Sequence, residues 1–197
     1  IRKYGYYYVD KTGMIADLLE TETAEVTLIT RPRRFGKTMG MSMLANFFDI
    51  REDSKPMFEG LEISQNTELC SQWMNQWPVL FLSFKDVDGL TFASAKGMLL
   101  ERIANLCKAH SYLALSERVN PDDVKIFKKL SDLVNGDPTD AMMKTAISLL
   151  MQMMRDHYGK PVILLIDEYD VPIAKASANG YYPEMLEVIK GLMSTAL

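Results

Sequence analysis

Residues 25–48 constrain the fold of this chain more than any other segment. Glu25–Thr30 (EVTLIT) is rich in β-branched residues and predicts a short buried strand. A basic loop, Arg31–Phe35, follows, and Lys37–Phe48 has the apolar spacing of a helix. Gly36-Lys37-Thr38 matches the end of the G-x-x-x-x-G-K-[ST] (Walker A) pattern, with Arg31 at the position of the first glycine. Strand, tight loop and helix in this order indicate a phosphate-binding turn.

The residue types in this turn suit an anion. Backbone N–H groups and the positive end of the helix dipole converge on the loop, and Gly36 leaves room for a phosphate. Lys37 can reach β- and γ-phosphates, and the Thr38 hydroxyl can coordinate Mg²⁺. Arg33 and Arg34 either add charge to this cradle or face solvent or a protein partner. A basic loop on a solvated helix end is the plainer alternative, but helix N-termini favour acidic residues.

A second motif, which is acidic, follows another apolar run. Val162–Ile166 (VILLI) predicts a buried strand, and Asp167-Glu168 follows it directly. Ligands of open α/β sheets bind at the carboxyl ends of the strands. Asp167 is expected to hold Mg²⁺ with Thr38, and Glu168 to polarise an attacking water as general base. Asp170 is expected to cap the next turn rather than to support the site.

The remaining pattern predicts an α/β fold. Pro78 opens the second strand along the chain, Val79–Phe84, and Val162–Ile166 is the third. Buried strands thus alternate with helices, as in a parallel sheet. We expect a P-loop NTPase-type parallel sheet flanked by helices, with an enlarged helical region at about residues 92–158, between the second and third strands. Residues 51–76 predict a loop with a short helix. The other expected helices are Thr12–Glu20, Phe92–Leu113, Pro121–Leu133, Thr139–His157 and Pro183–Ala196, and one side of the helix Lys37–Phe48 is expected to carry Met39, Met43, Leu44, Phe47 and Phe48.

Composition narrows the functional classes. The 197 residues carry a net charge of -4, which argues against a broad basic surface for nucleic acid. Cys70 and Cys107 lack metal or disulfide spacing, so a reducing, cytoplasmic setting is expected. No apolar run is long enough for a transmembrane helix, and no membrane partner is expected. Because the chain starts at Ile1, we expect a fragment of a longer protein.

Three segments together resemble the predicted AAA-ATPase-like family of bacteria and archaea: Tyr8–Thr12 (YVDKT), Arg31–Thr38 (RPRRFGKT) and Leu165–Asp170 (LIDEYD). The resemblance spans nearly all of residues 1–197. It implies the N-terminal part of an AAA-like ATPase domain that uses ATP and Mg²⁺, with Arg33, Arg34, Phe35, Gly36, Lys37 and Thr38 at the phosphates. It implies that Asp10, in the VDKT segment, lies near the adenine.

The resemblance also implies a longer parent protein. Such domains are often followed by a nuclease-like domain of the PD-(D/E)XK type, so DNA is an expected partner of that remainder. Family members continue into a strand with a polar sensor residue, between the first and third strands, which we expect beyond Leu197. Oligomer formation is typical of related ATPases, but nothing singles out an arginine finger.

Four functions remain open at this point. The first is an ATPase in which hydrolysis moves an attached domain, and the second is a nucleotide-binding regulatory module with little or no turnover. Arg31 and the absent sensor strand suit the second. A kinase is disfavoured by the acid pair Asp167-Glu168, and a nucleic-acid binder by the acidic composition.

Overall fold

A computed structural model describes residues 8–20, 26–30, 35–133 and 138–196. The chain divides into two compact units, Ile1–Val79 and Leu80–Leu197. The described elements of the first unit are α1 (Gly13–Glu20), α2 (Lys37–Phe48), α3 (Lys55–Phe58), the 3-10 helix η2 (Glu62–Gln65) and α4 (Thr67–Trp73). Strand β1 (Val79–Ser83) begins at the boundary. The second unit continues with α5 (Phe92–Ala109), η3 (Ser111–Leu115), α6 (Pro121–Ser131), α7 (Asp140–Lys144), α8 (Ala146–Tyr158), β2 (Ile163–Asp167), α9 (Val171–Asn179) and α10 (Tyr182–Ala196).

The first unit is organised around the C-terminal half of α2. Leu44, Phe47 and Phe48 are buried, and the ring of Phe47 meets those of Phe48 and Phe58 edge to face. This spacing of three and four residues puts the three side chains on one face of the helix. Met39, one to two turns earlier, is 53% exposed, so its expected place on the buried side is wrong. The core contacts of α2 are made by its second half.

Asn75 ties the end of α2 to the residues that follow it. Its side-chain amide donates to the carbonyls of Asn46 (3.0 Å) and Asp49 (2.9 Å), and its Oδ1 accepts from the backbone N–H of Ser54 (2.9 Å). Asn75 has a φ of 55°, in the left-handed region that asparagine tolerates better than most residues. One side chain therefore satisfies three backbone groups that α2 and α3 leave open.

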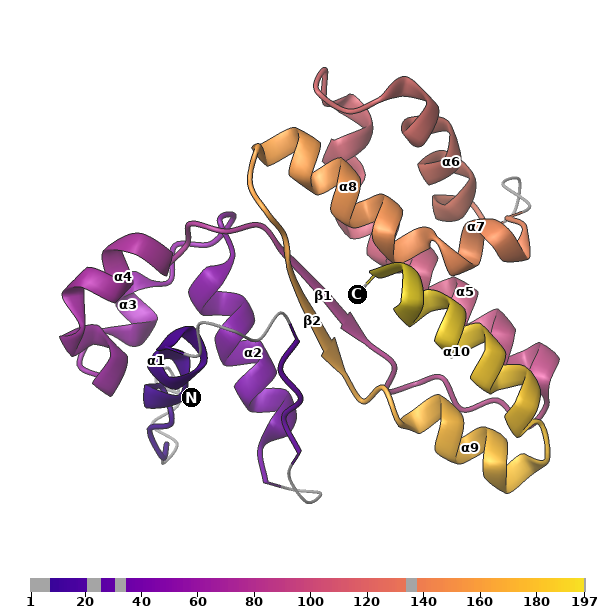
Figure 1. Ribbon diagram of the computed structural model, residues 1–197, viewed down its shortest axis with the longest axis horizontal. Helices are drawn as coiled ribbons and strands as arrows, with labels where there is room; N and C mark the ends of the chain where they lie inside the picture. The colour runs from indigo at the N-terminus through magenta and orange to yellow at the C-terminus, as the bar shows by residue number, and fades with distance from the viewer. Residues whose placement is uncertain (1–7, 21–25, 31–34, 134–137, 197) are drawn as a thin grey trace. The chain divides into compact units, whose positions relative to one another are not determined.

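The second unit contains the two-stranded sheet β1–β2. Both strand arrows run in the same direction, and the N–H of Phe84 donates to the carbonyl of Asp167 at the carboxyl ends (3.0 Å; Figure 1). The apolar runs that predicted these strands are confirmed to within a residue at either end. Helices α5, η3, α6, α7 and α8 all lie between β1 and β2 in the chain.

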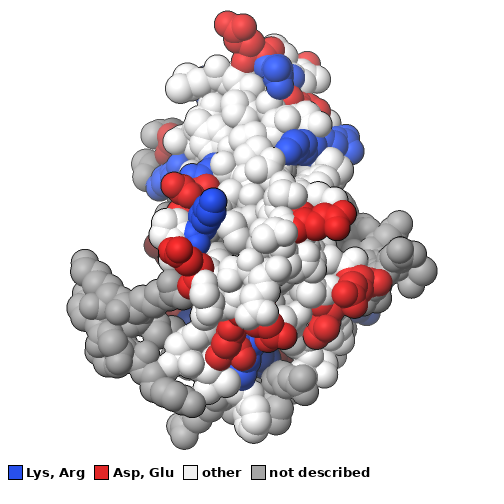
Figure 2. Space-filling view, turned by 90° about the vertical axis from the view of Figure 1, so that its left-hand side faces the viewer, with Lys and Arg blue, Asp and Glu red and all other residues white. Residues whose placement is uncertain are grey.

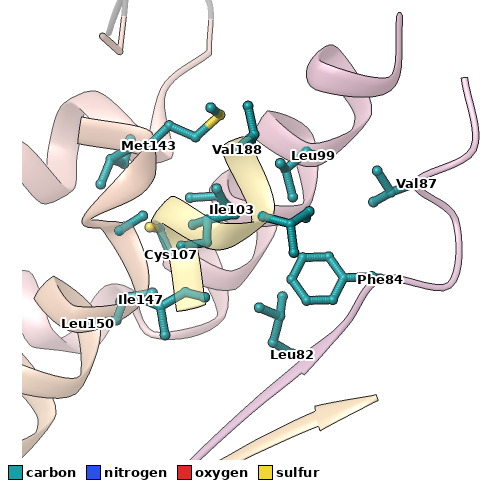
Figure 3. Packing of buried hydrophobic residues seen from close by; sticks show 14 of the residues in the cluster. Leu82, Phe84, Val87, Leu99, Ile103, Cys107, Met143, Ile147, Leu150 and Val188 are labelled. Carbon is teal, nitrogen blue, oxygen red and sulfur yellow. The ribbon is translucent and has the colours of Figure 1, made fainter. Parts of the chain in front are cut away.

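One face of the sheet packs on the helical core of this unit. Leu82 and Phe84 point from β1 toward the helices, beside Leu99 and Ile103 of α5 (Figure 3). In the contacts between helices, α5 packs against α6, and α10 packs against α7, α8 and α9. The helices that pack against this face of the sheet therefore include some that precede β2 in the chain and some that follow it.

The predicted first strand is wrong. Val26–Thr30 is not in a strand, and the side chains of Val26 and Leu28 are 55% and 64% exposed. A strand requires a neighbour for its backbone hydrogen bonds, and within the described residues this segment pairs with none. The observed sheet thus confirms the α/β class and the parallel pair, but not a larger P-loop sheet.

Apart from shifts of one or two residues at helix ends, the helices differ from expectation in four respects. The first helical segment after β1 ends at Ala109 and continues as η3, and the expected helix Thr139–His157 breaks at Thr145. At that break the Thr145 hydroxyl donates to the carbonyl of Ala141 (3.1 Å), a local bond that competes with helix geometry. Residues 51–76 form α3, η2 and α4 rather than one short helix, and α9 was not predicted.

Two further observations concern the apolar character of the helices and the charge on the surface. Within the described ranges, no helix combines the length and apolar character needed to span a membrane. On the face drawn in Figure 2, acidic side chains gather in several groups with basic side chains between them.

Candidate functional site

The first half of the candidate site is the N-terminus of α2. Gly36 precedes the helix with φ 77° and ψ 25°, a left-handed conformation that favours glycine. A Cβ at Gly36 would meet no atom within 4 Å, so its requirement is conformational rather than steric. The carbonyl of Gly36 accepts from the N–H of Gly40 (2.9 Å), which closes the first turn.

Nothing in the first turn of α2 neutralises its positive end. The turn contains no acidic residue, and no side chain caps the helix. The first N–H groups of a helix have no partner within it and point toward its N-terminal end. Lys37 and Thr38 occupy this turn, the former half-buried and the latter exposed. Among the described residues, the local structure has the features that favour binding of an anion, and that role stays a prediction.

The expected phosphate residues are only partly described. The structure brings Phe35, Gly36, Lys37 and Thr38 together at one helix end, with Phe35 61% exposed. Arg33 and Arg34 lie outside the described residues, so their contribution to the loop stays a prediction.

Asp10 has a clear structural role. Its Oδ2 accepts from the N–H of Glu62 (2.7 Å), and its Oδ1 from the N–H (2.9 Å) and hydroxyl (2.7 Å) of Thr12. Partial burial raises the pKa of Asp10, but the hydrogen bonds from Glu62 and Thr12 outweigh it, so the pKa lies below its ordinary value. Thr12, fully buried, accepts in turn from the N–H of Ile63 (3.1 Å). The two side chains join the segment before α1 to η2, and the contact of Asp10 with adenine stays a prediction.

The second half of the site is the carboxyl end of β2. Asp167 is only 5% exposed, and its Oδ2 makes no hydrogen bond within the described residues. An unpartnered buried carboxylate oxygen is costly, because it has lost water without gaining a donor. Such an atom at the end of a parallel strand is the feature that a bound cation would satisfy.

Glu168 follows with an unusual backbone. Its φ is 56°, although most residues other than glycine avoid this region, and its carbonyl accepts from the N–H of Val171 (3.1 Å). Its side chain is half-buried. Strain of this kind is often found at functional sites, where the surrounding structure holds it in place. Asp170 stands at the N-cap position of α9, as expected, but its side chain makes no capping hydrogen bond.

The donor set at Asp167 fits Mg²⁺. This ion keeps several waters and takes one or two protein carboxylates, with phosphate oxygens completing the shell. The described residues contain no group of three or more His, Cys, Asp and Glu side chains that could hold a metal ion. Thr38 belongs to the first unit and Asp167 to the second, so their joint coordination of one ion stays a prediction.

Sequence reasoning passed over Ser83. It is the one polar residue of the strand β1 and lies half-buried at its carboxyl end. The signal was present, since a hydroxyl interrupts an otherwise apolar run just before the strand ends.

A glycine-opened helix with lysine and threonine in its first turn, and a buried acid ending a parallel strand, are features by which α/β proteins bind nucleoside triphosphates. The chain belongs to the predicted AAA-ATPase family, whose model matches residues 1–197. The resemblance inferred from the three sequence segments is thereby confirmed.

One curated relative is the "Uncharacterized protein in vnfD 5'region" of Azotobacter chroococcum mcd 1. It is 29% identical over 171 residues, which cover 85% of this chain and 26% of that protein. The chain therefore spans about a quarter of the length of this relative. No solved structure matches the chain.

Proposed function

We propose that this chain binds ATP with Mg²⁺ and hydrolyses it. The observation that carries the proposal is the first turn of α2, where Gly36 adopts a left-handed backbone and Lys37 and Thr38 follow without a neutralising acid. Membership of the predicted AAA-ATPase family supports ATP as the nucleotide. The buried, unpartnered oxygen of Asp167 supports a cation beside it.

The proposed roles follow from the chemistry of each group. Lys37 and the N–H groups of the turn bind the β- and γ-phosphates, helped by Arg33, Arg34 and Phe35 of the same loop. Thr38 and Asp167 hold Mg²⁺, which when bound would offset the negative charge of the triphosphate.

Glu168 acts as the general base that orients and polarises the attacking water. The left-handed backbone of this residue sets the direction in which its side chain leaves the main chain. Asp10 belongs to the segment that contacts the adenine, and its hydrogen bond with the N–H of Glu62 holds that segment against η2.

The proposal extends to the parent protein. Hydrolysis in this chain drives a conformational change in a following, nuclease-like domain, and that domain is where DNA binds. We also propose an oligomeric, bacterial protein of the cytoplasm. The free thiols of Cys70 and Cys107 are in keeping with a reducing compartment.

The test is Mg²⁺-dependent phosphate release by the wild type and by Glu168→Gln. Removal of a general base typically lowers turnover by about 10²- to 10⁴-fold. Glu168→Gln should lose turnover to this extent and still bind ATP, whereas the control Glu101→Gln, at an exposed position on α5, should match the wild type. Wild-type protein that binds ATP tightly without turnover would instead establish a nucleotide-binding regulatory module.

A further inference from the structure

The register of the sheet places Ser83 beside Asp167. In a parallel pair of strands, each residue lies opposite one residue of the other strand. When its N–H takes part in the ladder, it donates to the carbonyl of the residue that precedes this opposite residue in the chain. The hydrogen bond from the N–H of Phe84 to the carbonyl of Asp167 therefore aligns Phe84 with Glu168, and Ser83 with Asp167. Adjacent strands lie about 5 Å apart, so these two side chains are lateral neighbours on one face.

That face is the one turned away from the helical core. Side chains alternate along a strand, and Leu82 and Phe84 point from β1 into the core (Figure 3). Leu164 and Ile166 of β2 pack against the same core. Ser83 lies between Leu82 and Phe84 in the chain, and Asp167 directly follows Ile166. Both side chains therefore lie on the opposite face of the sheet.

The hydrogen-bonding state of the two side chains is complementary. The Ser83 hydroxyl oxygen accepts from the N–H of Lys85 (3.4 Å), and no other hydrogen bond of this hydroxyl occurs within the described residues. A hydroxyl has one donor and two acceptor positions, so Ser83 retains its proton and a lone pair. The neighbouring Asp167 Oδ2 is buried and unpartnered. Within the described residues, no direct hydrogen bond joins these two side chains.

We propose that Ser83 is a positioning residue for the cation held by Asp167. The Ser83 oxygen accepts a hydrogen bond from a cation-bound water, and the carboxylate of Asp167 ligates the ion from the adjacent strand. This inference rests on the proposed function, because the cation in question is the one that accompanies ATP. It adds a residue that neither the sequence motifs nor the comparisons assign.

The effect of removing Ser83 should fall on the metal rather than on the nucleotide. Loss of an outer-shell hydrogen-bond partner typically weakens metal affinity by about 10- to 100-fold. We therefore expect about tenfold weaker Mn²⁺ affinity in the presence of ATP. The affinity for ATP in the presence of a chelator should not change, because Ser83 does not touch the nucleotide.

Ser83→Thr and Ser83→Val form a matched pair. Threonine and valine have nearly the same shape and both suit a strand, but only threonine keeps the hydroxyl. Ser83→Ala removes the hydroxyl without adding volume and serves if the larger side chains disturb the fold. Asp167→Asn provides the reference for loss of a direct ligand, and thermal unfolding establishes that each variant is folded.

The measurement is a Mn²⁺ titration of the protein with ATP, followed by electron paramagnetic resonance of the free ion. The proposal is supported if Ser83→Thr binds Mn²⁺ like the wild type while Ser83→Val and Ser83→Ala bind about tenfold more weakly. Equal affinities in all three variants and the wild type would overturn the role of Ser83 and leave the proposed ATP site standing. A wild type that takes up no Mn²⁺ with ATP would overturn the ATP site itself, and this inference with it.

Discussion

Replacing Asn75 by alanine should destabilise the first unit strongly. The substitution removes three hydrogen bonds, those to Asn46, Asp49 and Ser54. At about 1 kcal/mol each, these contribute roughly 3 kcal/mol. Alanine at a φ of 55° adds about 1 kcal/mol of backbone strain. The total of about 4 kcal/mol is comparable to the whole stability of many small domains, which is about 5–15 kcal/mol.

Tryptophan fluorescence during urea unfolding measures this effect in the first unit alone. Trp73 and Trp77 are the two tryptophans of the chain, and their rings stack at 4.9 Å. With an m-value of about 1.5 kcal/mol per molar urea, a loss of about 4 kcal/mol lowers the midpoint by roughly 2–3 M. Asn75→Gly loses the hydrogen bonds but tolerates the backbone, so it should lose about 3 kcal/mol. A midpoint for Asn75→Ala within about 0.3 M of the wild type would refute this reasoning.

Three further predictions concern single side chains. Glu168→Gly should relieve the left-handed strain and raise the stability of the second unit by about 1 kcal/mol in thermal unfolding, whereas Glu168→Ala, which keeps the strain, should not. The lowered pKa of Asp10 means that its carboxylate stabilises the folded state above about pH 4, and that this stabilisation is lost as the pH falls through the folded pKa. Asp10→Asn should therefore flatten the acid dependence of urea unfolding below about pH 4, and an acid dependence equal to that of the wild type would contradict this role of Asp10. Burial raises the pKa of Cys107 to about 12, so a thiol reagent at neutral pH should label Cys70 in the folded protein and Cys107 only after unfolding.

Elements with strong local signals could be predicted from the sequence. The helix Lys37–Phe48 has the bounds that its apolar spacing and preceding glycine predict, and β1 and β2 follow from short apolar runs between turn residues. These signals lie within each segment and can therefore be recognised without knowledge of the rest of the chain.

Features that depend on distant parts of the chain were not predictable. Val26–Thr30 has the composition of a strand, but a strand exists only where a partner accepts its hydrogen bonds. Helix α9 was not predicted for a different reason, because it is short and rich in alanine and its periodicity is weak. Pro172 near its start and Gly180 after its end are local signals for this helix. Both signals were missed.

The candidate site divides in the same way. Residue types and spacing indicated Lys37, Thr38, Asp167 and Glu168. The hydrogen bonds of Asp10 with Glu62 and of Thr12 with Ile63, by contrast, join segments about 50 residues apart and leave no trace in a local pattern. The strained backbone of Glu168 is likewise a property of the folded chain and not of its residue type.

Calorimetric titration of the protein with Mg²⁺-ATP tests the central claim most directly. The comparison is between the wild type, Lys37→Ala at the first turn of α2, and Lys55→Ala, which removes an exposed lysine of α3 in the same unit. The account predicts that wild type and Lys55→Ala bind ATP alike and that Lys37→Ala, while folded, loses binding. Folded wild-type protein that does not bind ATP, or Lys37→Ala that binds it as the wild type does, would contradict the account.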